Sequence, residues 1–168
     1  MKLARLLHGA GADLLVADLD PGRVRSAEAE FGARGVEAAA VATVPADVFA
    51  PCALGDAVTA ANVDRIAAAV VAGAANNVFA SNEVAERLEE RGIIYAVDFI
   101  ANAGGIVYDD QYRARPKVRP FDEARARTYV DGIFDRTLRT FALADEFDLP
   151  LWRAGLRLAE ENLDRTPA

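Results

Sequence analysis

The chain has 168 residues, of which 52% are hydrophobic, and its 19 basic and 26 acidic side chains leave a formal net charge of -7. This length suits one domain of ordinary size with a core of its own. A single Cys and a single His exclude a disulfide framework and a Cys/His zinc cluster. The acidic balance, with arginines scattered along the chain, argues against a nucleic-acid surface.

Apolar segments indicate neither a membrane protein nor a secreted one. The longest run of small apolar residues covers 67–75, whereas a membrane-spanning helix needs roughly 20 residues. The N-terminal segment lacks the long apolar stretch and the small-residue cleavage site of a secretion signal. We therefore expect a cytoplasmic protein that binds no metal, no nucleic acid and no membrane.

The first two thirds of the chain alternate between short strands and helices. A helix is expected over 1–8, and a strand over 14–17 is followed by a helix that Asp20 caps, Pro21 opens and Gly32 ends. Further elements are two short apolar pieces at 41–44 and 47–50, a helix over 62–69, a strand over 70–73, a helix over 83–90 and a strand over 93–97. This alternation is typical of an α/β fold with a parallel sheet covered on both faces.

The pattern changes after Pro120. Apolar residues then recur at helical spacing in two groups, which predict two helices: Val130, Ile133, Phe134, Leu138 and Phe141, then Trp152, Leu156, Ala159 and Leu163. The charged segment 108–120 contains two prolines and is expected to connect the two parts. We predict a sheet-containing domain over 1–118 and a helical segment over 119–168 that packs on it.

Asp18 is the first candidate for a binding residue. An acidic side chain at the carboxyl end of a strand in such a sheet accepts hydrogen bonds from the ribose hydroxyls of a dinucleotide and repels a 2′-phosphate. The alternative, a second aspartate that forms the turn before Asp20, is equally open. A dinucleotide site also requires a Gly-rich phosphate loop about 20 residues earlier, and counting back from Asp18 passes Met1. The helix over 1–8 then corresponds to the remainder of the helix after that loop.

Three segments that follow expected strands have recognisable motifs: DVFAPCALG at 47–55, AGAANN at 72–77 and DFIANAGG at 98–105. In order and spacing they resemble the cofactor-domain motifs of the glutamate/leucine/phenylalanine/valine dehydrogenase family. The terminal LPLW at 149–152 and AEE at 159–161 also resemble the leucine and valine dehydrogenase branch. The resemblance implies a Rossmann-like, doubly wound parallel sheet that lacks its first strand and is followed by C-terminal helices, with NAD as cofactor.

The same resemblance implies roles for individual residues. Ala53 and Leu54 would lie along the adenosine side of NAD and contact it through their backbone, and Cys52 just before them would also belong to the cofactor site. Asn76 would stand near the reacting carbon, between the nicotinamide and the amino group of the substrate, and Asn102 would pair with the nicotinamide carboxamide. An Asn side chain offers both a donor and an acceptor, as orienting a carboxamide requires.

Each of these residues also has a simpler interpretation. Asn tolerates left-handed backbone, so the Asn76–Asn77 pair and Asn102 could belong to turns. Cys52 has no expected base beside it and is predicted to be a small buried residue. Trp152 and Phe141 are expected in the core, and the charge run over 83–91 is expected to be a solvated helix face.

The family's reaction is the oxidative deamination of an L-amino acid, here expected to be a branched-chain one, to a 2-oxo acid and ammonia with hydride transfer to NAD. The resemblance implies that the catalytic lysine belongs to a separate N-terminal domain, because Lys2 and Lys117 lie in no segment that resembles the catalytic one. We therefore expect no catalytic residue in this chain, and activity only with a complementing N-terminal domain. The family generally self-associates, which implies a homo-oligomer. Two alternatives remain: a non-catalytic nucleotide-binding or regulatory module, and a packing fragment without a ligand.

Overall fold

The computed structural model describes residues 1–109 and 121–164, and the chain divides into two compact units, Met1–Val44 and Pro45–Ala168. Unit 1 contains a two-stranded sheet in the order β1-β2, and unit 2 a three-stranded sheet in the order β3-β4-β5, with all pairs parallel. A doubly wound order 3-2-1-4-5-6 without its first strand leaves these same sets of pairs. The α/β fold with parallel sheets and C-terminal helices is therefore confirmed.

Unit 1 follows the sequence prediction closely around its second helix. Its elements are α1 (Lys2–Gly9), β1 (Leu15–Val16), α2 (Pro21–Phe31), β2 (Arg34–Gly35) and a short 3-10 turn, η1 (Val41–Thr43). Oδ1 of Asp20 accepts a hydrogen bond from the backbone N–H of Gly22 at 2.7 Å, and Gly32 has a left-handed φ of 62°. The cap and the glycine therefore fix both ends of α2.

The core of unit 1 is small, and one of its strands gave no signal in the sequence. Ala27, Phe31 and Ala33 are buried, and Ala4, Leu14 and Val16 pack against them. The unpredicted strand β2 pairs Arg34 with Leu15 and Gly35 with Val16. Its two residues carry no apolar run, so only the pairing with β1 identifies it as a strand.

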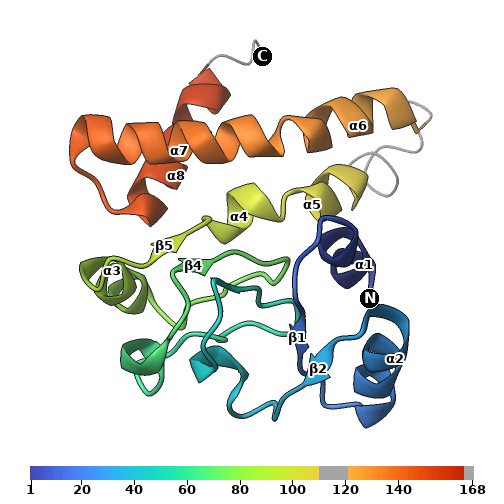
Figure 1. Cartoon of the computed structure of the whole chain (residues 1–168). Helices are drawn as coiled ribbons and strands as arrows, with labels where there is room; N and C mark the ends of the chain where they lie inside the picture. Colours follow the sequence, from blue (N-terminus) through green and yellow to red (C-terminus); the bar gives the residue numbers. More distant parts are fainter. Residues whose placement is uncertain (110–120, 165–168) are drawn as a thin grey trace. The chain divides into compact units, whose positions relative to one another are not determined.

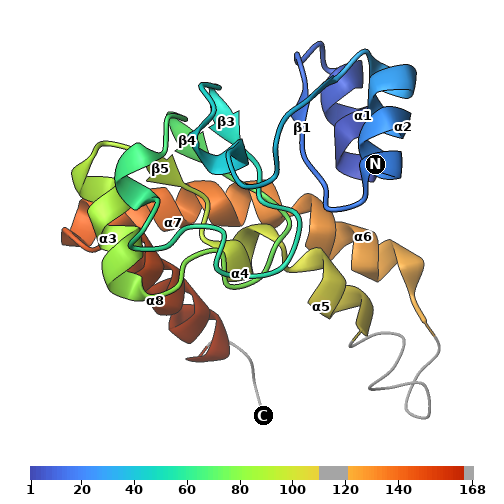
Figure 2. The ribbon, with the colours of Figure 1, turned by 90° about the horizontal axis from the view of Figure 1, so that it is seen from below.

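Unit 2 places a short parallel sheet among helices. Its elements are β3 (Val48–Phe49), η2 (Val63–Arg65), β4 (Val70–Val71), α3 (Asn82–Glu90), β5 (Ile94–Tyr95), α4 (Asp98–Ala101), α5 (Gly104–Asp109), α6 (Glu123–Asp131), α7 (Ile133–Phe147) and α8 (Leu151–Asp164). Figure 2 shows β3, β4 and β5 side by side in this order. Figure 1 shows α6 and α7 following one another along nearly the same line. The most deeply buried side chains include Val71, Tyr95, Leu88, Leu143 and Ala154.

Two helix predictions in unit 2 were wrong. Instead of a helix over 62–69 there is only the single turn η2, because the N–H groups of Ala69 and Val70 donate to the carbonyl of Asp47 beside β3. The first of the two expected tail helices is divided at Gly132 into α6 and α7. Glycine is a poor helix former, which favours a break at that residue. Of the expected connector over 108–120, residues 108 and 109 belong to α5 and the rest lies outside the described residues.

The charge run on α3 is only partly a solvated face. Oε1 of Glu89 accepts a hydrogen bond from the backbone N–H of Leu151, and Oε1 of Glu86 accepts one from the indole N–H of Trp152, both at 2.9 Å. These two carboxylates hold the first turn of α8 against α3. Trp152 and Phe141 are half-buried rather than fully enclosed. No helix among the described residues is long and apolar enough to cross a membrane.

Candidate functional site

The segments that follow β3 and β4 lie in direct contact. The backbone N–H of Ala75 donates to the carbonyl of Pro51 at 3.0 Å. A Cβ on Gly73 would lie 2.0 Å from that same carbonyl oxygen, so the close approach requires glycine. Because the strands are parallel, their carboxyl ends meet at one edge of the sheet, where ligands bind in open α/β folds.

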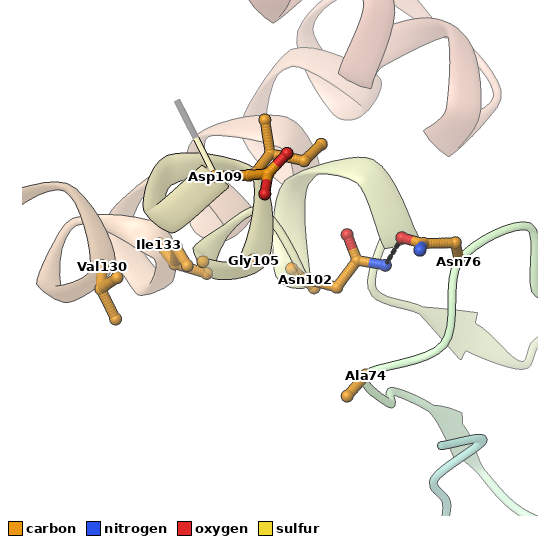
Figure 3. A pocket seen from close by; sticks show the side chains of 10 residues that line it. Ala74, Asn76, Asn102, Gly105, Asp109, Val130 and Ile133 are labelled. Atoms are coloured by element: carbon orange, nitrogen blue, oxygen red, sulfur yellow. Dashed lines mark hydrogen bonds between the residues drawn. The ribbon is translucent and has the colours of Figure 1, made fainter. Parts of the chain in front are cut away.

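Asn102 and Asn76, two of the predicted site residues, are joined by a hydrogen bond at this edge. Nδ2 of Asn102 donates to Oδ1 of Asn76 at 2.7 Å and to the backbone carbonyl of Ala75 at 2.8 Å. Figure 3 shows the Asn102 amide nitrogen turned toward Asn76. A backbone carbonyl can only accept, so its contact fixes which end of the Asn102 amide is the nitrogen.

The oxygen of the Asn102 amide is left without a donor. Oδ1 is shielded from solvent and accepts no hydrogen bond from the described part of the chain. A buried acceptor without a donor costs about 1–3 kcal/mol. Such an atom in a native fold calls for an explanation, and a bound donor is one.

The turn interpretation of the Asn76–Asn77 pair is correct for Asn77. Its φ is 50°, in the left-handed region that Asn tolerates. Asn76 is exposed and keeps its side chain on Asn102. Asn102 itself has a φ of -101° and follows the last residue of α4, so no left-handed backbone explains an asparagine there. The two asparagines of the pair thus differ: Asn77 makes the turn and Asn76 presents an amide.

Both amides border a pocket of about 850 Å³, a size typical of small-molecule sites. The lining residues are Ala74, Asn76, Ala101, Asn102, Gly104, Gly105, Ile106, Asp109, Val130 and Ile133. These residues come from the loop after β4, from the end of α4, from α5, and from the junction of α6 and α7, and Figure 3 shows Ala74, Asn102, Gly105 and Val130 as one example of each. The lining is mixed: it carries the two amides and the Asp109 carboxylate, and its aliphatic part, called the aliphatic wall below, consists of Ile106, Val130 and Ile133.

The sequence did not predict the aliphatic wall. No sequence motif points to Ile106, and the helical spacing of Val130 and Ile133 predicts only that both lie on the apolar face of a single helix. They line the pocket because α5 packs against α6, a contact between segments that the sequence pattern does not pair. The three-residue spacing of Val130 and Ile133 places them on one side of the chain across Gly132, and this spacing was the available signal.

The expectation that Cys52 is buried was wrong. Pro51 is buried, but Cys52, Ala53 and Leu54 are exposed, Leu54 at 89%. After β3 the backbone leaves the sheet and returns only at Asp56, whose N–H donates to the carbonyl of Asn77 at 2.8 Å. The three side chains therefore lie on the surface of this loop, beside the turn at Asn77.

Asp18 lies in unit 1, two residues after β1. Its Oδ1 accepts a hydrogen bond from the backbone N–H of Asp20 at 2.9 Å, and its Oδ2 lies 3.4 Å from Nη1 of Arg23. The backbone N–H of Asp20, with a further contribution from Arg23, lowers the pKa of Asp18 below its ordinary value. One oxygen thus makes the turn, as the turn interpretation predicts, and the other is paired with the Arg23 guanidinium.

The parallel sheets and the paired amides at the strand ends are those of an α/β protein whose ligand site would lie at this edge of the sheet. The family model for glutamate/leucine/phenylalanine/valine dehydrogenase matches residues 14–110. The chain therefore belongs to this family.

Individual amino-acid dehydrogenases are similar to nearly the whole of this chain. The chain is 36% identical to the leucine dehydrogenase of Thermoactinomyces intermedius over 163 residues, which are 97% of this chain and 43% of that protein. It is 36% identical to the valine dehydrogenase of Streptomyces virginiae, over 91% of this chain and 42% of that protein. The crystal structure of L-tryptophan dehydrogenase from Nostoc punctiforme superposes with a TM-score of 0.87 at 32% identity, covering 98% of this chain and 48% of that one. The chain thus spans less than half the length of these relatives.

Proposed function

We propose that this chain is the NAD-binding part of an L-amino-acid dehydrogenase, and that the nicotinamide end of NAD occupies the pocket beside Asn76 and Asn102. The observation that supports this most directly is the buried Oδ1 of Asn102, which has no donor among the described residues. The amide N–H₂ of a nicotinamide carboxamide is such a donor. The residues present therefore fit the cofactor.

Each predicted site residue has a role in this proposal. Asn102 holds the carboxamide, and Asn76 presents its amide to the amino group of the substrate. In unit 2, Cys52, Ala53 and Leu54 run along the adenosine side of NAD. In unit 1, Asp18 accepts hydrogen bonds from the ribose and selects NAD over NADP. Residues 1–118 form the cofactor domain in this assignment, and residues 119–168 form the helical segment. When bound, NAD accepts a hydride.

The aliphatic wall of the pocket supports an apolar substrate. Ile106, Val130 and Ile133 can cover an aliphatic side chain, and burial of such a side chain contributes about 1.5–3 kcal/mol. The names of the leucine and valine dehydrogenase relatives point the same way. We therefore assign oxidative deamination of a branched-chain L-amino acid to the complete enzyme, with the general base supplied by a complementing domain and the enzyme assembled as a homo-oligomer.

Ligand protection against thermal unfolding tests the nicotinamide assignment. NADH and ADP-ribose share the adenosine and both riboses, and only NADH carries the nicotinamide. We expect NADH to raise the Tm of the chain more than ADP-ribose at equal concentration, because a tighter ligand stabilises the folded state further. Equal protection would overturn the nicotinamide assignment and favour a nucleotide-binding or regulatory module. No protection by either ligand would favour a packing fragment.

A further inference from the structure

Asp98 lies one helical turn before Asn102. It is the first residue of α4, and the backbone N–H of Asn102 donates to its carbonyl at 2.8 Å. Residues four apart on a helix share one face. The carboxylate of Asp98 and the amide of Asn102 therefore point toward the same neighbouring segment, the loop over 74–78 that follows β4.

Both side chains hold that loop, on opposite sides of its turn. Asn102 binds the carbonyl of Ala75 and the amide of Asn76, while Oδ2 of Asp98 accepts a hydrogen bond from the backbone N–H of Val78 at 3.1 Å. Asn77 lies between these attachments with its left-handed φ of 50°. A non-glycine residue in this region is strained and persists only where its surroundings determine it.

Neither oxygen of Asp98 is directed at the pocket. Oδ1 accepts a hydrogen bond from the backbone N–H of Phe99 at 2.8 Å, and Oδ2 is engaged by Val78. Asp98 is half-buried and is not among the residues that line the pocket. A role for it in the binding site would therefore act through the loop.

We infer that Asp98 is a positioning residue: its hydrogen bond to Val78 fixes the turn at Asn77 and thereby the direction of the exposed Asn76 amide at the nicotinamide site. This inference rests on the proposed function. Removing the carboxylate frees one side of the turn, so Asn76 samples other directions and the nicotinamide end loses part of its binding. The loop assigned to the adenosine half touches this turn only through the backbone, where the N–H of Asp56 donates to the carbonyl of Asn77, so the adenosine half should lose less binding than the nicotinamide half.

The test compares NADH and ADP-ribose on Asp98→Ala, Asp98→Asn and the unaltered chain. The quantity compared is the ratio of the two dissociation constants. We expect Asp98→Ala to reduce the advantage of NADH over ADP-ribose about five- to tenfold, the loss of roughly one hydrogen bond. Asp98→Asn gives up the bond from the N–H of Phe99 but can keep an oxygen that accepts from Val78, and it should retain the advantage to within about twofold. A merely structural role would weaken both ligands equally and leave the ratio unchanged.

Asp20→Ala is the matched control. It removes a carboxylate that likewise accepts a backbone N–H, that of Gly22 at 2.7 Å, but belongs to unit 1. It should leave the ratio unchanged. Two results would overturn the inference and leave the proposed function standing. One is an NADH advantage in Asp98→Ala as large as in the unaltered chain, and the other is complete loss of the advantage in a folded Asp98→Asn. If Asp98→Ala does not fold, Asp98→Leu takes its place, because it also removes the acceptor and keeps a side chain of similar size; an undiminished NADH advantage there would overturn the inference. An unaltered chain without any NADH advantage would overturn the proposed function and the inference with it.

Discussion

Nδ2 of Asn102 lies 2.7 Å from Oδ1 of Asn76, so a residue after β5 and a residue after β4 share one hydrogen bond beside the pocket. The same nitrogen also binds the carbonyl of Ala75. Both hydrogens of the Asn102 amide are thereby used within the protein, and its buried oxygen accepts no hydrogen bond from the described residues.

Replacing Asn102 separates its structural and ligand roles. Asn102→Ala removes two hydrogen bonds and should lower the free energy of unfolding by about 1–2 kcal/mol, while the advantage of NADH over ADP-ribose disappears. Asn102→Asp should be worse, because a carboxylate would face the carbonyl of Ala75. Denaturant titration measures the first effect and ligand binding the second.

Asn62 supplies a matched control for Asn102. Its side chain also bridges loop backbone, accepting from the N–H of Thr59 at 2.8 Å and donating to the carbonyl of Ala57 at 3.0 Å. Asn62→Ala should therefore cost similar stability and keep the NADH advantage. Loss of that advantage in both variants would mean that loop stability, and not the Asn102 amide, determines nicotinamide binding.

Asp18 should determine the choice between NAD and NADP. Asp18→Ser removes the charge that repels a 2′-phosphate and leaves Arg23 without its carboxylate partner, so the preference for NADH over NADPH should narrow about tenfold, or about 1.4 kcal/mol. The double variant Asp18→Ser with Arg23→Ala should bind NADPH less tightly than Asp18→Ser alone, because it lacks the guanidinium that can accommodate a 2′-phosphate. Asp13→Ser, which removes a carboxylate just before β1, is the control. An unaltered chain that binds NADPH as tightly as NADH contradicts the assignment.

Glu89 should make stability depend on pH. Burial raises the pKa of Glu89, although the hydrogen bond that it accepts from the backbone N–H of Leu151 acts to lower it. A carboxyl whose pKa is higher in the folded than in the unfolded state favours folding below its unfolded pKa, and this contribution is lost as the pH rises through the folded pKa. Glu89→Gln keeps an oxygen for Leu151 without the charge. The stability of Glu89→Gln relative to the unaltered chain should therefore increase as the pH is raised from 4 to 7, and should not decrease in this range.

Thermal or denaturant unfolding at several pH values checks this dependence. Glu90→Gln changes an exposed residue of the same helix and serves as the control. A stability difference between Glu89→Gln and the unaltered chain that stays constant with pH would show that burial of Glu89 has no effect on its ionisation.

Gly73 and Gly105 should respond oppositely to the same substitution. The Cβ of Gly73→Ala would overlap the Pro51 carbonyl, and such overpacking costs about 1–3 kcal/mol or more. Gly105 has open space around its Cβ position and lies in α5, so Gly105→Ala should preserve or raise stability, by up to about 1 kcal/mol. Equal unfolding midpoints for the two variants would disprove the contact between the loops after β3 and β4.

Sequence patterns identified the elements whose signals are local. The Asp20 cap and the Gly32 stop determine α2 because both act within one helical turn of it. Apolar runs located β1, β4 and β5 for the same reason, and Asn76 and Asn102 were found because they belong to motifs with fixed spacing from strand ends. The helix predicted over 62–69 is not formed, because the N–H groups of Ala69 and Val70 bond to the carbonyl of Asp47 and the helical preference of this segment is weak.

Only the tertiary structure decided which groups meet. The alternation of strand and helix segments along the chain indicated an α/β fold, and its motifs indicated the family and the two asparagines. That one asparagine amide is bonded to the other, that its oxygen is left unpaired, and that Val130 and Ile133 face the same pocket all depend on contacts between segments distant in the chain. Hydrogen-bond direction and side-chain burial arise from such contacts, and neither is encoded in residue spacing along a single segment.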